Sequence, residues 1–218
     1  MTLLSILVFG LFLGMRHATD SDHVVAVTTI ASRQPDIRGA AMIGAFWGIG
    51  HSITLLGVGG AIILFGIVIP EQLGLSLEFC VALMLILLGG LNLRVMFTVP
   101  GKARAETRGD DFHDHRRHLA LRPAMIGVAH GLAGSAAVAL LVLPIVQNPI
   151  WGMMYLAAFS IGTIIGMIMI TATIAVPVSY MARFESLHRH LGITAGFVSL
   201  AFGVFLAYQI GFVDGLFR

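Results

Sequence analysis

Residues 150–180 read IWGMMYLAAFSIGTIIGMIMITATIAVPVSY and contain no Asp, Glu, Lys or Arg. They lie inside a longer uncharged stretch, residues 123–182, and residues 39–70 form a second one. A helix needs about 20 predominantly apolar residues to cross the hydrocarbon core of a bilayer. Each stretch is therefore long enough for at least one membrane-spanning helix.

The composition of the whole chain also indicates a membrane protein. Of the 218 residues, 57% are apolar and only 11% are charged, whereas about a quarter are charged in an ordinary globular domain. Cys80 is the only cysteine, so the chain can form neither an internal disulfide nor a thiolate metal site. These values exclude a disordered chain, a disulfide scaffold and a nucleic-acid-binding module.

Hydropathy and helix-breaking residues predict six helices. The predicted helices cover residues 2–30, 40–69, 75–98, 122–145, 150–180 and 188–213. Prolines lie at or beside their ends, namely Pro70, Pro100, Pro123, Pro144 and Pro149. The runs are too long for the roughly 10-residue strands of a membrane barrel and lack their alternation. We therefore expect an all-α, polytopic membrane protein with six transmembrane helices.

Basic residues predict the orientation of these helices. Most lie in or beside the first, third and fifth connections: Arg33, Arg38, Arg94, Lys102, Arg104, Arg108, Arg116, Arg117, Arg122, Arg183 and Arg189. Cytoplasmic loops carry an excess of Lys and Arg. We expect these three connections in the cytoplasm, both termini outside, and the chain in the cytoplasmic membrane.

The two halves of the chain resemble each other. A shift of 113 positions superposes His17 on His130 and Gly14 on Gly127, and a shift of 112 superposes Gly50 on Gly162. Two halves of three helices each enter the membrane from opposite sides, which is the inverted-repeat plan of many secondary transporters. The expected organisation is a first repeat at 1–98, a loop at 99–121 and a second repeat at 122–218.

A polar segment interrupts the first predicted helix, where residues 16–23 read RHATDSDH. Each charge at such depth costs about 2.5–3.5 kcal/mol on insertion scales, so these side chains need partners or a wet cavity. Arg16 and Asp20 are spaced to pair on one helical face. His17, Asp22 and His23 offer two imidazoles and a carboxylate, a first shell suited to Ni, Co, Cu or Zn.

The spacing of these residues restricts how they could bind one ion. A straight helix separates His17 from His23 by about 9 Å along its axis and turns them about 120° apart. Either the helix is unwound here, as in transporters with discontinuous helices, or only part of the motif binds metal at once. Gly14 would make a break less costly.

Histidines in two other helices extend the candidate site. His51 and Ser52 follow two glycines in the second helix, and His51 is either a ligand or a hydrogen-bonded core histidine. His130 and Ser135 lie in the fourth helix at the positions that align with His17 and Asp22. Since this copy lacks the acids, packing or gating is as good an interpretation of His130 as ligation.

The pattern H-x4-D-H formed by His17, Asp22 and His23 resembles the signature of the nickel/cobalt transporter (NiCoT) family. Gly-His-Ser at His51 resembles the second motif of that family, and His-Gly-Leu-Ala-Gly-Ser at His130 is similar to its short, six-helix UreH-like relatives. The resemblance implies transport of Ni²⁺ or Co²⁺, with these four motif residues, His17, Asp22, His23 and His51, recognising the metal. Longer members carry a Gly-Phe-Asp-Thr-Ala motif that this chain lacks. We expect no permanently bound cofactor, and cytoplasmic nickel chaperones as partners.

The polar loop at 99–121 contains a second group of histidines, His113, His115 and His118, beside several aspartates. A His- and Asp-rich tract can hold divalent metal loosely, so this loop is a candidate for metal buffering in the cytoplasm. The alternative is an ordinary solvated loop of mixed charge.

Three other functions fit parts of the pattern. His17 and Asp22 match the H-x4-D dyad of membrane acyltransferases, where histidine is the general base. Ser135 and His51 could form the dyad of a membrane protease. A third alternative is a proton-coupled carrier of another solute, with the polar segment relaying protons. We expect a transporter and not an enzyme, because the acids lie deep and Arg16 is the lone nearby cation.

Overall fold

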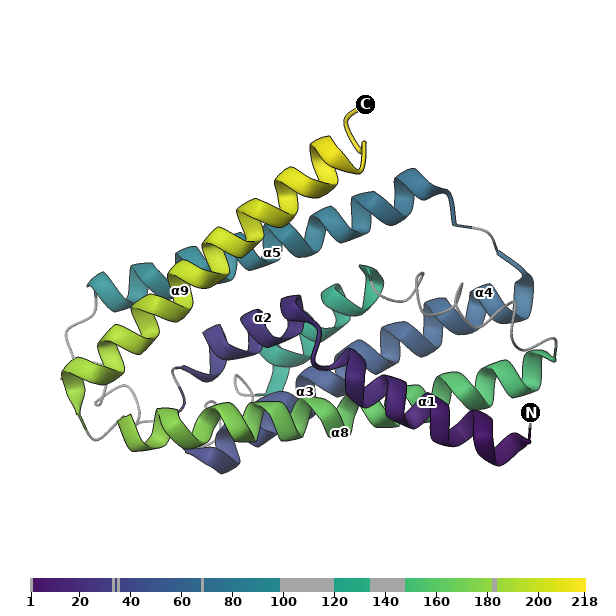
Figure 1. The fold of residues 1–218 in the computed structure, drawn as a ribbon, viewed down its shortest axis with the longest axis horizontal. Helices are drawn as coiled ribbons and strands as arrows, with labels where there is room; N and C mark the ends of the chain where they lie inside the picture. Colours follow the sequence, from purple (N-terminus) through teal and green to yellow (C-terminus); the bar gives the residue numbers. More distant parts are fainter. Residues whose placement is uncertain are drawn as a thin grey trace.

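The computed structural model describes residues 2–32, 34, 36–67, 69–98, 120–133, 148–181 and 184–218. Within these residues the regular structure is entirely helical, so the expected all-α class is confirmed. The helices, labelled as in Figure 1, are α1 (Leu3–His17), α2 (Ser21–Ala31), α3 (Ile37–Thr54), η1 (Leu55–Gly59), α4 (Gly60–Phe65), α5 (Glu71–Thr98), α8 (Pro149–Met181), α9 (Glu185–Tyr208) and η2 (Gln209–Val213). Residues 120–133 form one more helical segment.

Four helices of the described chain are long and apolar enough to cross a membrane: Ile37–Phe65, Glu71–Thr98, Pro149–Met181 and Ser186–Val213. The bent pair α1 and α2 is a fifth candidate. The predicted span at 122–145 extends into residues 134–147, which lie outside the described part, so the count of six stays a prediction.

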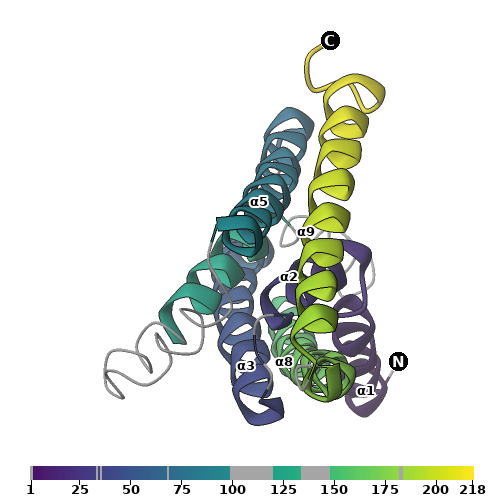
Figure 2. The same cartoon turned by 90° about the vertical axis from the view of Figure 1, so that its left-hand side faces the viewer.

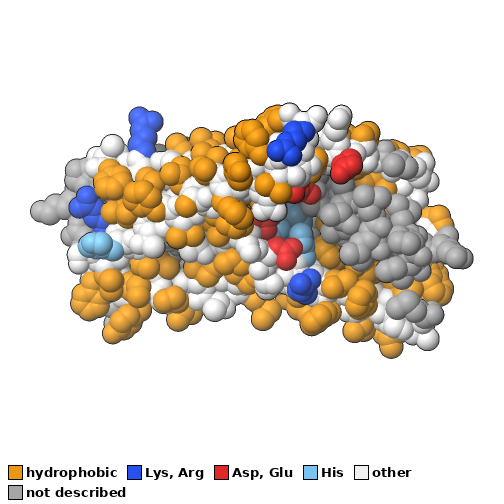
Figure 3. All heavy atoms as spheres, turned by 45° about the horizontal axis from the view of Figure 1, so that its top comes forward, with side chains coloured by type: hydrophobic (Ala, Val, Ile, Leu, Met, Phe, Trp, Pro, Cys, Tyr) orange, Lys and Arg blue, Asp and Glu red, His pale blue; other side chains and the backbone are white. Residues whose placement is uncertain are grey.

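Large apolar side chains cover the outside of the molecule. Phe65 is 77% exposed, Leu4 71% and Ile150 68%, and Figure 3 shows hydrophobic side chains spread over one face. Contiguous apolar surface of this extent is rare on soluble monomers. It is the surface that a protein surrounded by lipid requires.

The helices form two layers, which are visible in both ribbon views (Figures 1 and 2). Helices α5 and α9 pack along each other as one layer, and α1, α3 and α8 form the other. Helix α2 lies between them and contacts α5, α9 and α8. This position places the end of the polar segment 16–23, which forms the first turn of α2, between the two layers.

Two polar contacts help to fix the pair formed by α5 and α9. The buried Asn92 side chain donates to the Gly192 carbonyl at 2.7 Å. The buried Ser199 hydroxyl donates to the Leu85 carbonyl at 2.9 Å. Interhelical hydrogen bonds of this kind hold membrane helices together where lipid offers no hydrophobic driving force.

Glycines allow the closest helix contacts. A Cβ atom on Gly14 of α1 would clash with the backbone of α8, and one on Gly162 of α8 would clash with the backbone of α1. Gly50 of α3 and Gly127 make the corresponding close approach between α3 and the segment 120–133. Small residues at these positions bring the backbones together, as at many membrane helix interfaces.

The first predicted helix, at 2–30, is broken into two helices. α1 ends at His17, α2 begins at Ser21, and the two are bent by 56°. Asp20 takes an extended conformation as the N-cap of α2, a position that Asp favours. The break therefore lies at residues 18–20 and not at Gly14, whose role is helix packing.

Candidate metal site

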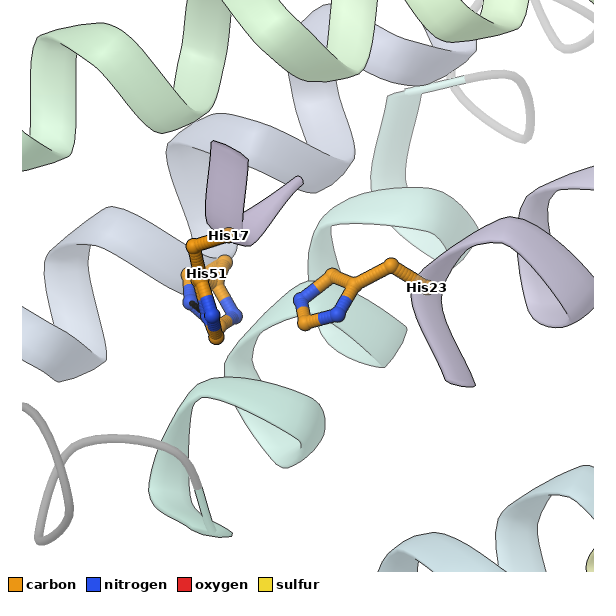
Figure 4. A group of neighbouring side chains, drawn as sticks. All are labelled: His17, His23 and His51. Carbon is orange, nitrogen blue, oxygen red and sulfur yellow. Dashed lines mark hydrogen bonds between the residues drawn. The ribbon is translucent and has the colours of Figure 1, made fainter. Parts of the chain in front are cut away.

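Three histidines from three helices point toward one another (Figure 4). The ring centroids of His17 and His23 are 4.6 Å apart, those of His17 and His51 are 5.3 Å apart, and those of His23 and His51 are 5.2 Å apart. The Nε2 atoms of His17 and His51 are separated by 3.3 Å. Two nitrogens bound at about 2.1 Å to a tetrahedral ion lie about 3.4 Å apart, so this separation suits a shared metal ion.

The break between α1 and α2 brings His17 and His23 together. His17 is the last residue of α1, and His23 lies in the first turn of α2. The turn is held locally, since the Thr19 hydroxyl donates to the Arg16 carbonyl at 2.6 Å and the Asp20 amide donates to the His17 carbonyl at 3.0 Å. The helix is thus broken at residues 18–20, which fits the first of the two alternatives that the spacing left open.

His51 reaches the cluster because its surroundings are small. Gly48 approaches Ile164 of α8, and Gly127 of segment 120–133 approaches the backbone of α3 beside His51. The π-helical turn η1 begins four residues further on, at Leu55. Such widened turns are rare and are often found at functional sites.

Asp20 pairs with a histidine and not with Arg16, which corrects the expected ion pair. Its Oδ2 atom lies 2.8 Å from Nδ1 of His17, while Arg16 is exposed. A carboxylate that accepts from Nδ1–H fixes the tautomer of the ring and leaves Nε2 free to bind metal. Asp20 is therefore suited to orient His17.

Asp22 lies between two histidines. Its Oδ1 is 3.2 Å from Nδ1 of His23, and its Oδ2 is 3.1 Å from Nε2 of His130. The rings of His23 and His130 have centroids 4.1 Å apart. His130 thus belongs to the same cluster, a location that the sequence pattern left open. Its alignment with His17 was the signal for that position.

The cluster is buried and rich in uncommitted nitrogen atoms. His23, His51 and His130 are 1%, 0% and 2% exposed. Among the described residues, the buried atoms without a hydrogen-bond partner include His23 Nε2, His51 Nδ1 and His130 Nδ1. An unpaired buried polar atom is costly, and coordination of a cation by His23 Nε2 would relieve that cost for this atom.

Two groups in the described part of the chain have three donor atoms within 4.8 Å of one another. The first is His17, His23 and His51, and the second is Asp22, His23 and His130. Imidazole nitrogen with one carboxylate is a donor set that suits divalent transition metals. Both groups use His23.

The electrostatic surroundings favour a cation. The carboxylates of Asp20 and Asp22 lie within hydrogen-bond distance of histidines of the cluster. The carboxylate of Glu78 in α5 lies within electrostatic range of Asp22 and of Asp214 after η2. Figure 3 shows histidine side chains visible between acidic side chains near the middle of this face.

The remaining candidate residues fall into two sets. Ser52 is buried and donates to the Ser160 carbonyl of α8 at 3.2 Å, so its hydroxyl serves helix packing. The others, Ser135, His113, His115 and His118, lie outside the described residues.

These observations define a class of protein. The described chain has several apolar helices that can span a membrane and an apolar exterior, and it holds buried imidazole groups beside partly exposed carboxylates at a broken helix. Ionisable groups placed in this way are typical of membrane transporters. The chain is a multi-pass membrane protein of the transporter class.

Comparison with known proteins identifies the family. The sequence profile described as NicO, high-affinity nickel-transport protein, matches residues 3–131. The urease accessory protein UreH of Bacillus sp. (strain TB-90) is 36% identical over 224 residues, which cover 99% of this chain and 96% of the relative. The chain belongs to this nickel-transport family, and the resemblance inferred from its motifs is confirmed. No solved structure matches it significantly.

Proposed function

We propose that this protein carries Ni²⁺, and also Co²⁺, across the cytoplasmic membrane through the cluster formed by His17, Asp22, His23 and His51. The convergence of these side chains from α1, α2 and α3 at a helix break carries the proposal. Such groups persist in a membrane span where they serve a pathway for ions or protons. Imidazole ligands suit nickel and cobalt alike.

The family supports nickel as the cargo, because its description names nickel transport. Cobalt rests on the chemistry of the donor atoms alone. The acids around the cluster would attract a hydrated cation, which then exchanges water for imidazole nitrogen and carboxylate oxygen. No second metal or organic cofactor is needed for this exchange.

Alternating access is the transport mechanism that we propose, with residues 1–98 and 122–218 as inverted three-helix repeats. The glycine contacts support it: Gly14 packs against α8 as its aligned partner Gly127 packs against α3. In each case the first helix of one half packs against the second helix of the other half. A two-fold axis that relates the halves would produce this pattern. Rocking of one half against the other would then open the cluster to each side in turn.

The proposed orientation follows the positive-inside rule, with both termini outside and the loop at 99–121 in the cytoplasm. An ion released inward would meet His113, His115 and His118, which we propose as a weak metal buffer. Cytoplasmic nickel chaperones are the proposed recipients of the ion.

An acyltransferase-type enzyme is not favoured. Its dyad would require His17 to pair with Asp22, but the carboxylate bonded to His17 is that of Asp20. Asp22 instead contacts His23 and His130. The arrangement supports ion coordination better than activation of a hydroxyl group by His17.

Uptake of radioactive nickel into proteoliposomes tests the proposal. Purified wild type should accumulate nickel, and His17→Ala, Asp22→Asn and His51→Ala should each reduce the rate at least tenfold. His190→Ala is the matched control, because His190 is exposed and its Nδ1 lies 2.6 Å from the Ser186 carbonyl, away from the cluster. Wild-type vesicles that take up no more nickel than empty vesicles would refute transport. Equal uptake by all variants would refute the site.

A further inference from the structure

His23 is shared by both groups of donor atoms, His17 with His51 on one side and Asp22 with His130 on the other. We propose that the groups are two successive positions for a single ion, and that they cannot be occupied together. His23 serves both positions with its two ring nitrogens. The inference rests on the proposed function and deepens it.

The two nitrogens of His23 face different groups. Nδ1 lies 3.2 Å from Oδ1 of Asp22. Nε2 is buried and has no hydrogen-bond partner among the described residues, and Figure 4 shows the His23 ring directed toward His17 and His51. Nε2 therefore serves the position with His17 and His51, and Nδ1 serves the position with Asp22 and His130.

The chemistry of imidazole makes the positions exclusive. A neutral ring has one nitrogen that carries a proton and one that offers a lone pair. With the ion on Nε2, the proton is on Nδ1 and is donated to Asp22. With the ion on Nδ1, the proton is on Nε2 and Asp22 is free to bind the ion. As the ion moves, Nδ1 releases its proton to the water shed by the ion and Nε2 takes one up from that water, so His23 holds one proton in both states and the charge of the ring is unchanged.

The internal repeat gives the two positions a place in the transport cycle. His17 and His130 are aligned with each other by the shift of 113 residues, and each belongs to only one of the two groups. Each position thus takes one ligand from the first helix of a different half. The two positions are thus related by the same repeat as the two halves, whose rocking exposes the cluster to each side of the membrane in turn.

Binding stoichiometry and uptake together test the inference. Equilibrium dialysis against NiCl₂ should give one ion per chain when the loop histidines His113, His115 and His118 are replaced by Ala, and every variant is measured in this background. His51→Ala and His130→Ala should each still bind one ion, because each leaves the other group complete. Both should lose at least tenfold in proteoliposome uptake, and His23→Ala should lose binding and uptake together. His190→Ala is again the control for removal of one imidazole.

Three results would overturn the inference. Two ions per chain in this background would show independent sites, and loss of binding in either His51→Ala or His130→Ala would show one composite site. Full uptake by His130→Ala would show that the second position is not used. A variant that elutes as an aggregate is replaced by the corresponding Gln variant and judged in the same way. Absence of wild-type uptake would instead refute the proposed function, independently of the stoichiometry.

Discussion

Carboxylates beside imidazoles define the chemistry of this cluster at the scale of single residues. Asp20 holds Nδ1 of His17, which directs Nε2 toward His51. Partners behind a ligand of this kind typically contribute 10–100-fold in metal affinity. Asp20 therefore belongs to the proposed site as a positioning residue, although it is not itself a member of either donor group.

In a His130→Ala background, which leaves only the position with His17 and His51, Asp20→Asn should weaken nickel binding by about 10–100-fold, because the amide is a poorer acceptor for Nδ1–H of His17. His17→Ala should cost at least as much, since it removes the ligand itself. Isothermal titration of purified protein measures both. Asp36→Asn is the control, because Asp36 caps α3 and Asn caps equally well. An Asp20→Asn affinity equal to that of the control would contradict the positioning role.

The pattern of residue types predicted part of the cluster. His17, Asp22, His23 and His51 were recognised because such side chains are costly in hydrocarbon without a purpose. The expected pair of Arg16 with Asp20 was wrong, because the i,i+4 rule assumes a continuous helix. His130 was left open because its neighbours lack the acids that mark the first motif.

At the scale of the helices, a break in the chain determines which side chains meet. The metal chemistry required either a break or partial binding, since a straight helix keeps His17 and His23 apart. The location of the break was less predictable. The sequence suggested a break near Gly14, whereas the structure has the break at residues 18–20, where Asp20 is the N-cap of α2.

Gly14→Val should destabilise the protein by about 1–3 kcal/mol or more, because its side chain would enter the backbone of α8. Gly90→Ala is the matched control: a Cβ atom there meets nothing within 4 Å. The midpoint of thermal unfolding in detergent measures the effect. The predicted order is a lower midpoint for Gly14→Val and no loss for Gly90→Ala, and equal midpoints would contradict the close packing of α1 on α8.

At the scale of the whole molecule, acidic side chains from different helices gather near the candidate metal site. Glu78 and Asp214 come from distant parts of the chain yet lie within electrostatic range of each other. Acids beside a binding site raise the local concentration of cations and the rate of association. No sequence pattern indicated this grouping, because it depends on how α5 and η2 meet.

Neutralising both acids, Glu78→Gln with Asp214→Asn, should reduce nickel uptake several-fold at low nickel concentration and low salt. The rate at saturating nickel should change little, because the ligands are intact. Added salt should diminish the difference, since it screens exposed charges. Glu71→Gln, in the first turn of the same helix α5, is the control. An effect confined to the saturating rate would contradict the attraction of cations by these acids.

The predicted orientation places Thr2 and Arg218 outside the cell. In a Cys80→Ser background, a cysteine introduced as Thr2→Cys or Arg218→Cys should react with a membrane-impermeant maleimide in intact cells. Cys80 must be removed first, because it is exposed. Labelling that requires broken cells would reverse the orientation.

X-ray absorption at the nickel edge of the purified, nickel-loaded protein tests the central claim that the buried histidines coordinate the transported ion. We predict scattering from several imidazole rings in the wild type, and a smaller imidazole contribution in His17→Ala and His51→Ala. An oxygen-only shell that stays the same in these variants would contradict the claim.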